Sequence, residues 1–84
     1  MNSSHPIRVN SIRGRITQGV YAKGTKSERK SVFIETDDAR YILRRKTGPA
    51  FGDVKLLPYI GHNVKCEGFL VGTTFLSEQI EVVD

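Results

Sequence analysis

Short runs in which apolar and polar residues alternate constrain the fold of this chain more than any other feature. In the run 9–20, Ile12 and Ile16 fall on one side of the alternation, and Arg13 and Arg15 fall on the other. Successive side chains of a β-strand point to opposite faces, so this pattern predicts a strand with one buried and one exposed face.

Four more runs rich in β-forming residues follow, separated by turn residues. We predict strands over residues 9–20, 31–36, 40–45, 62–71 and 74–83. Gly14 predicts a bulge or a sharp bend in the first strand. The second and third strands form a predicted hairpin around Asp37 and Asp38, whose side chains are expected to cap the turn. The polar and basic segment 21–30 is predicted to be a loop.

One short helix is predicted between the third and fourth strands, over residues 53–60. Asp53 is a suitable N-cap and Gly61 a suitable stop. Pro58 limits the helix to one or two turns because it has no N–H to bond back to the preceding turn. The apolar face of this helix is expected to comprise Leu56, Leu57 and Ile60.

Length and composition indicate one small domain over residues 1–84, in which residues 1–6 are expected to be a mobile tail. A chain with 38% hydrophobic and 26% charged residues can form a compact core. The single cysteine, Cys66, cannot form an internal disulfide, which favours a reducing cytoplasm. No run approaches the ~20 apolar residues of a membrane span, and the first residues lack the apolar run of a signal peptide, so we expect no membrane partner.

The predicted order of elements is three strands, a short helix and two strands. With the segments GRI (14–16), VFIETDDARYIL (32–43), YIGHNVKCEGFL (59–70) and QIEVVD (79–84), the chain resembles a small bacterial-type oligonucleotide/oligosaccharide-binding (OB) domain. The resemblance implies a mainly β fold, a five-stranded Greek-key barrel with one short helix between strands three and four. An SH3-like barrel is the closest alternative, and the helix after the third strand argues against it.

Positive charge is concentrated in the first half of the chain. Residues 1–46 contain eleven Lys/Arg and four Asp/Glu, a net charge of +7, whereas residues 47–84 have a net charge of −3. A concentrated positive field attracts polyanions, because neutralised phosphates release counterions. The charge pattern therefore predicts a nucleic-acid-binding surface, and single-stranded DNA or RNA is the expected partner.

The expected site is the outward face of the first three strands together with the basic loop. Phe33 would offer a ring on which bases stack, and the flanking cations would meet phosphates. The resemblance also implies a binding surface at this face and at the loops after strand one and between strands four and five. The candidate residues are Arg13, Arg15, Lys23, Lys26, Arg29, Lys30, Phe33, Arg40 and Arg44.

Other interpretations remain open for these residues. Phe33 and Ile42 could fill the barrel, or they could form the apolar patch of a protein-interaction or homodimer interface rimmed by charge. The basic loop could clamp phosphates or simply be solvated, and Tyr21 could stack a base or anchor that loop. A sugar or small-ligand binder is compatible with the fold resemblance, although no residue specifically favours it.

Catalytic and metal-binding motifs are not expected. Residues 19–26 have the two glycines of a Walker A loop but end in Thr-Lys, and residues 27–30 match Ser-x-x-Lys without its companion motifs. His62 and Cys66 would lie roughly 13 Å apart on a strand, at ~3.3 Å per residue. Cys66 is therefore expected to be a small buried apolar residue. We predict a protein that is not an enzyme and has no metal and no cofactor.

Overall fold

The computed structural model describes residues 5–21, 24–26, 29–49 and 52–84, with only the backbone of Tyr21 and Arg29. The secondary structure differs from the predicted bounds by at most two residues at any end. Its elements are β1 (Ile7–Tyr21), β2 (Arg29–Glu35), β3 (Arg40–Arg45), the 3₁₀-helix η1 (Val54–Tyr59), β4 (Asn63–Val71) and β5 (Thr74–Val82).

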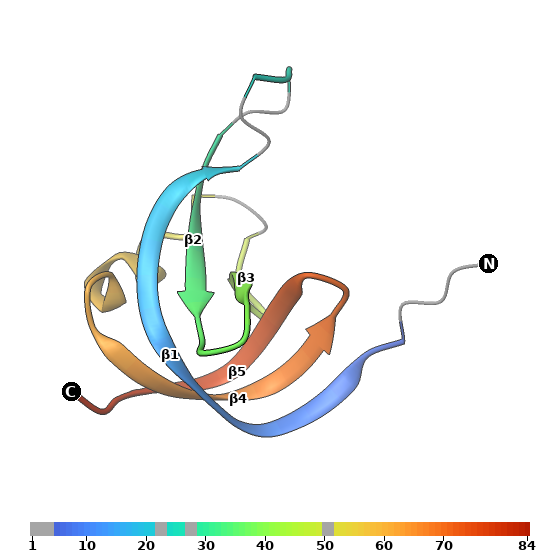
Figure 1. Cartoon of the computed structure of the whole chain (residues 1–84), viewed down its shortest axis with the longest axis vertical. Helices are drawn as coiled ribbons and strands as arrows, with labels where there is room; N and C mark the ends of the chain where they lie inside the picture. Colours follow the sequence, from blue (N-terminus) through green and yellow to red (C-terminus); the bar gives the residue numbers. More distant parts are fainter. Residues whose placement is uncertain (1–4, 22–23, 27–28, 50–51) are drawn as a thin grey trace.

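The five strands form one sheet that closes into a ring in the order β1-β2-β3-β5-β4 (Figure 1). Neighbouring strands are antiparallel, except that β3 and β5 are parallel. The long strand β1 closes the ring because it pairs with two neighbours. Its first part pairs with β4 from Ile7 to Arg15, and its second part pairs with β2 from Arg15 to Tyr21.

Gly14 lies where β1 changes from one partner strand to the other. A Cβ atom on Gly14 would lie 2.5 Å from the carbonyl oxygen of Glu35 and 2.8 Å from Cγ1 of Ile34. Glycine is therefore required by the close approach of the two strands. The register shift of β1 is not at Gly14 but lies between Val9 and Ile12.

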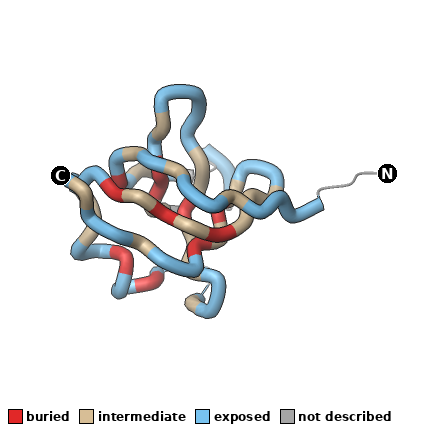
Figure 2. Tube along the Cα trace, turned by 90° about the horizontal axis from the view of Figure 1, so that it is seen from below, coloured by how far each residue is buried: buried red, intermediate tan, exposed pale blue. Residues whose placement is uncertain are grey.

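The inside of the ring of strands is filled by the apolar side chains of the alternating positions. Figure 2 shows the buried residues along the middle of the strands and exposed residues on the connections. The buried cluster consists of Ile16, Ile34, Leu43, Leu56, Val64, Cys66 and Phe75. Val32 and Tyr41 pack against this cluster, and the predicted burial of Cys66 is confirmed.

The helix η1 lies where it was predicted, and Asp53 is its N-cap. The carboxylate of Asp53 accepts a hydrogen bond from the Lys55 N–H at 3.0 Å. Leu56 is buried, but Leu57 is 48% exposed, so the predicted grouping of these two leucines was wrong. The prediction assumed α-helical spacing, whereas a 3₁₀-helix has about three residues per turn and separates consecutive side chains by about 120°.

Two connections also differ from their predictions. Strands β1 and β2 extend into the predicted loop 21–30 and pair as far as Tyr21 and Arg29, which forms a two-stranded ribbon that projects from the ring (Figure 1). In the β2–β3 turn, the Thr36 hydroxyl accepts hydrogen bonds from the N–H groups of Asp38 and Ala39. Thr36, rather than either aspartate side chain, therefore caps this turn.

Candidate nucleic-acid interface

Four of the predicted arginines share the outer face of β1 and β3. Because Ile16 and Leu43 point into the ring, the alternating positions Arg13, Arg15, Arg40 and Arg44 point outward. Arg13, Arg15 and Arg40 are exposed, and Arg44 is partly buried. The register places Glu35 of β2 directly between Arg15 and Arg40.

These cations are distinguished by the lack of a carboxylate partner. In the described part of the chain, the outer-face arginines form no ion pair, and neither do Lys26 and Lys30. Glu35 instead accepts a hydrogen bond from the Thr17 hydroxyl at 3.2 Å. The cations that are paired with carboxylates are Arg8, Arg45, Lys46 and Lys65. The residual positive charge therefore lies mainly over β1, β2 and β3.

Phe33 is not the exposed ring that the sequence predicted, because its side chain is only 3% exposed. Phe33 is outside the interior cluster, and the guanidinium carbon of Arg40 lies 4.2 Å from its ring centroid. On the neighbouring strand Gly19 has no side chain, and a Cβ atom there would lie 3.3 Å from the Phe33 ring. The Phe33 side chain is thus buried on the outer side of the sheet, between β1 and the Arg40 side chain.

The apolar patch considered around Phe33 and Ile42 therefore lacks an exposed aromatic ring, and only Ile42 of the pair is partly exposed. Ile42 lies directly opposite Phe33 in the β2–β3 register and is partly buried. The alternation of the sequence places both residues correctly on the outer face. It does not reveal that Gly19 makes room for the Phe33 ring or that Arg40 covers it.

Arg44 retains a hydrogen-bond donor that has no acceptor. Its Nε atom is buried and has no hydrogen-bond partner among the described residues. Most buried polar groups are satisfied, so each exception calls for an explanation, such as a bound water or ion. By register Arg44 lies beside Leu76 of β5.

The basic loop is only partly described. Lys26 is exposed in the turn at Gly24–Lys26, and Lys30 is exposed near the start of β2. The predicted residue Lys23 and the side chain of Arg29 lie outside the described residues, as does the side chain of Tyr21. The structure therefore places Lys30 on the side of β2 that carries Val32, among the residues that line a hollow beside η1, and does not assemble the whole predicted clamp.

A second aromatic ring with cations was missed by the sequence analysis. Phe69 of β4 has the guanidinium of Arg8 at 5.1 Å and the ammonium of Lys46 at 5.0 Å from its ring centroid. Both cations are ion-paired with Glu78, and Arg8 is also paired with Glu67. Hydrogen bonds from Arg8 and then Lys46 lower the pKa of Glu78. This group resembles the Phe33–Arg40 pair, but its charge is neutralised internally.

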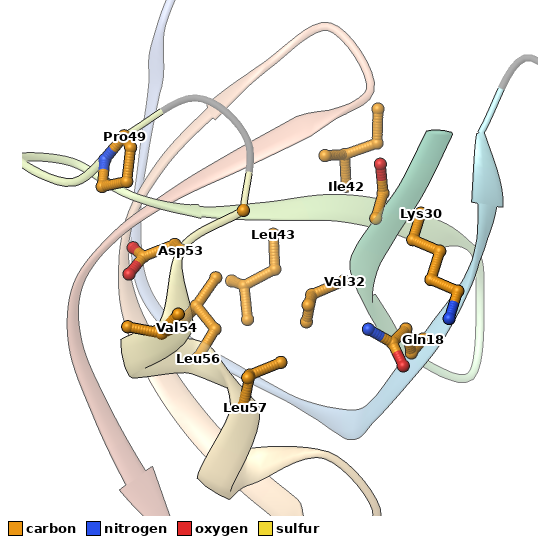
Figure 3. Close-up of a pocket in the computed structure, with 12 residues that line it drawn as sticks. Gln18, Lys30, Val32, Ile42, Leu43, Pro49, Asp53, Val54, Leu56 and Leu57 are labelled. Carbon is orange, nitrogen blue, oxygen red and sulfur yellow. The ribbon is translucent and has the colours of Figure 1, made fainter. Parts of the chain in front are cut away.

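A hollow of about 210 Å³ opens between η1 and the strands β2 and β3 (Figure 3). The β2–β3 ladder joins only Phe33–Glu35 to Arg40–Ile42, so the strands diverge beside this hollow. Its walls are mainly aliphatic and include Val32, Leu43 and Leu56. This hollow was not predicted from the sequence.

The carboxylate in this hollow is already used by the fold. Asp53 accepts hydrogen bonds from Nε of Arg45 at 2.6 Å and from Nη2 of Arg45 at 3.1 Å. These bonds are the main reason that the pKa of Asp53 is lowered, with the Lys55 N–H adding to them. Asp53 therefore holds η1 against β3 and is not free for a ligand.

The described residues offer little for metal or nucleophilic chemistry. Among them, no group of three or more His, Cys, Asp or Glu side chains gathers in one place. His62 is paired with Asp84, whose carboxylate also accepts from the Asn63 N–H at 2.7 Å. Burial raises the pKa of the Cys66 thiol to about 11, although a hydrogen bond with Ser77 opposes the shift.

Comparison with known proteins gives no match: no family model, no curated protein and no solved structure is significantly similar to this chain. Within the described residues, no helix has the length and apolar character needed to cross a membrane. The geometry and charge of the outer face are therefore the main indication of function.

Proposed function

We propose that this protein is an OB-fold module, not an enzyme, that binds single-stranded DNA or RNA along the outer face of β1, β2 and β3. The ring order β1-β2-β3-β5-β4, with η1 between β3 and β4, supports the OB assignment. OB folds are five-stranded Greek-key barrels that bind oligonucleotides on the face of strands two and three and at adjacent loops.

The observation that carries the proposal is the distribution of unpaired cations. Arg13, Arg15, Arg40 and Arg44 have no carboxylate partner among the described residues, whereas the cations near β4 and β5 are ion-paired. A polyanion that binds the outer face of β1 and β3 gains charge-assisted contacts without first breaking ion pairs. Arginine keeps its proton at all ordinary pH values, which suits phosphate binding and not proton transfer.

The buried position of Phe33 changes the expected mode of binding. A ring that is 3% exposed cannot stack on a base, so phosphate contacts with the arginines provide most of the affinity. The alternative function, a protein-interaction module that uses the Phe33/Ile42 patch, is less well supported, because Phe33 is buried and only Ile42 of the pair is partly exposed. We therefore retain nucleic-acid binding as the single proposed function.

An NMR titration of the isotope-labelled protein with a short mixed-sequence single strand tests this proposal. We expect the largest shift changes at 13–17, 33–35 and 40–44, and smaller ones over β4 and β5. Shift changes confined to the described loop residues 24–26, or the absence of any change at low ionic strength, would contradict it.

A further inference from the structure

We propose that the guanidinium of Arg40, and not an aromatic ring, is the surface on which a base of the bound strand stacks. This inference rests on the proposed function and names the residue that contacts the bases. It follows from how Arg40 and Phe33 are placed relative to each other and to their neighbours.

The Phe33 ring forms a fixed support under Arg40. The ring is buried between Gly19 of β1 and the Arg40 side chain, whose guanidinium carbon is 4.2 Å from the ring centroid. A cation at this distance from a ring is attracted by the negative face of the π-system. The side chain of Arg40 is therefore restrained, while the residue itself remains exposed.

Arg40 is also available to a ligand. Its cross-strand neighbour Glu35 bonds to Thr17, and Arg40 forms no ion pair with any described carboxylate. A guanidinium is planar, delocalised and weakly hydrated, and it can stack on a flat group with each of its two faces. The guanidinium carbon lies over the Phe33 ring, so the side of the guanidinium turned away from the ring can take a nucleobase, as arginine planes do in single-strand recognition.

Restraint of Arg40 before binding favours this role. A free arginine loses rotamer entropy when it stacks on a base, and a side chain already held on a ring loses less. The guanidinium also carries charge next to the phosphates. Because every base has a π-face, this contact predicts binding that tolerates different sequences.

The Phe69 group provides an internal comparison. It has the same ring-and-cation arrangement, but Arg8 and Lys46 are held by Glu67 and Glu78. A phosphate near those cations would face two carboxylates. We therefore expect stacking at Arg40 and none at Arg8.

The test uses fluorescence anisotropy at low ionic strength with two single strands of about 12 nucleotides, within the roughly 4–16 that an OB fold covers. One strand has mixed bases, and the other is abasic with the same phosphates. The variants are Arg40→Lys, which keeps the charge but cannot stack, and Arg8→Lys, the same change at the ion-paired arginine beside Phe69.

We expect Arg40→Lys to weaken binding of the mixed strand by about five-fold or more, the fold-change that corresponds to losing one stacked base. Its binding of the abasic strand should equal that of the wild type, and Arg8→Lys should leave both affinities nearly unchanged. Equal binding of the mixed strand by wild type and Arg40→Lys overturns the inference, as does an equal loss with both strands. Failure of the wild-type protein to bind either strand instead overturns the proposed function.

A second measurement does not depend on affinity. The side-chain protons of Arg40 should be shifted upfield by the Phe33 ring in the free protein and further upfield when the mixed strand binds. The abasic strand should not produce the second shift. An Arg40 signal that does not respond to the mixed strand, while other residues of the outer face do, contradicts stacking at this side chain.

Discussion

At the scale of single residues, burial of Phe33 is the finding that most changes the account of the site. We expect Phe33→Ala to lower the free energy of unfolding by about 3–5 kcal/mol, the usual cost of truncating a buried phenylalanine. Phe69→Ala, which removes a partly exposed ring, should cost less. Urea denaturation of both variants measures the difference, and equal costs would mean that Phe33 is not buried in solution.

Cys66 gives a second prediction at this scale. Burial raises its pKa to about 11, so the thiol is protonated and shielded at pH 8. We expect an aromatic disulfide reagent to label Cys66 only when the protein unfolds, and the labelling rate in urea should follow the unfolded fraction. Rapid labelling of the native protein would contradict the placement of Cys66 in the core.

At the scale of elements, the bond network of Asp53 holds η1 to the end of β3. The pKa of Asp53 is lowered mainly by hydrogen bonds from Arg45, so its carboxylate is more stable in the folded than in the unfolded chain. The stabilisation is therefore present above the unfolded pKa of about 3.9 and is lost as the pH falls through the lower folded value.

Asp53→Asn tests this linkage. We expect the variant to lose about 1.5–3 kcal/mol at neutral pH, the range for hydrogen bonds to a charged group, and to lose part of the acid dependence of stability. Urea denaturation from neutral to acidic pH measures both effects. Asp38→Asn, at an exposed turn aspartate, is the control, and an identical pH dependence in wild type and Asp53→Asn would refute the role of the carboxylate.

The elements were also the level at which the sequence was most informative. Period-two alternation in the first strand and runs of β-forming residues in the others located the strands, and Asp53 and Pro58 located and shortened η1, because these signals are local. Contacts between distant residues could not be predicted. Examples are the contact of Phe33 with Gly19, which leaves space for the ring, and the pairing of Glu78 with Arg8 and Lys46. Alternation assigns a residue to a face, but it does not say whether another strand's side chain covers it.

At the scale of the whole molecule, ion pairing decides which cations remain for a ligand. By register, Arg44, Leu76, Phe69 and Arg8 follow one another across β3, β5, β4 and β1, so the paired and unpaired cations share a continuous outer surface. Removing a carboxylate should therefore enlarge the binding surface.

We expect Glu78→Gln to release Lys46 and one contact of Arg8, to strengthen binding of a single strand, and to steepen its salt dependence. The slope of log affinity against log salt should become more negative by up to about 0.7 for each new phosphate contact. Asp38→Asn removes the same charge without releasing an ion-paired cation and should change the slope little. Identical effects of the two variants would indicate that only net charge matters.

The salt dependence of single-strand binding measures whether the unpaired arginines of the outer face bind phosphates. With three to five contacts at about −0.7 each, the wild-type slope should be roughly −2 to −3.5. Arg44→Ala should make the slope less negative by somewhat under one unit, whereas Lys55→Ala, at an exposed lysine of η1, should leave it unchanged. A wild-type slope near zero, or equal changes in the two variants, would contradict the claim.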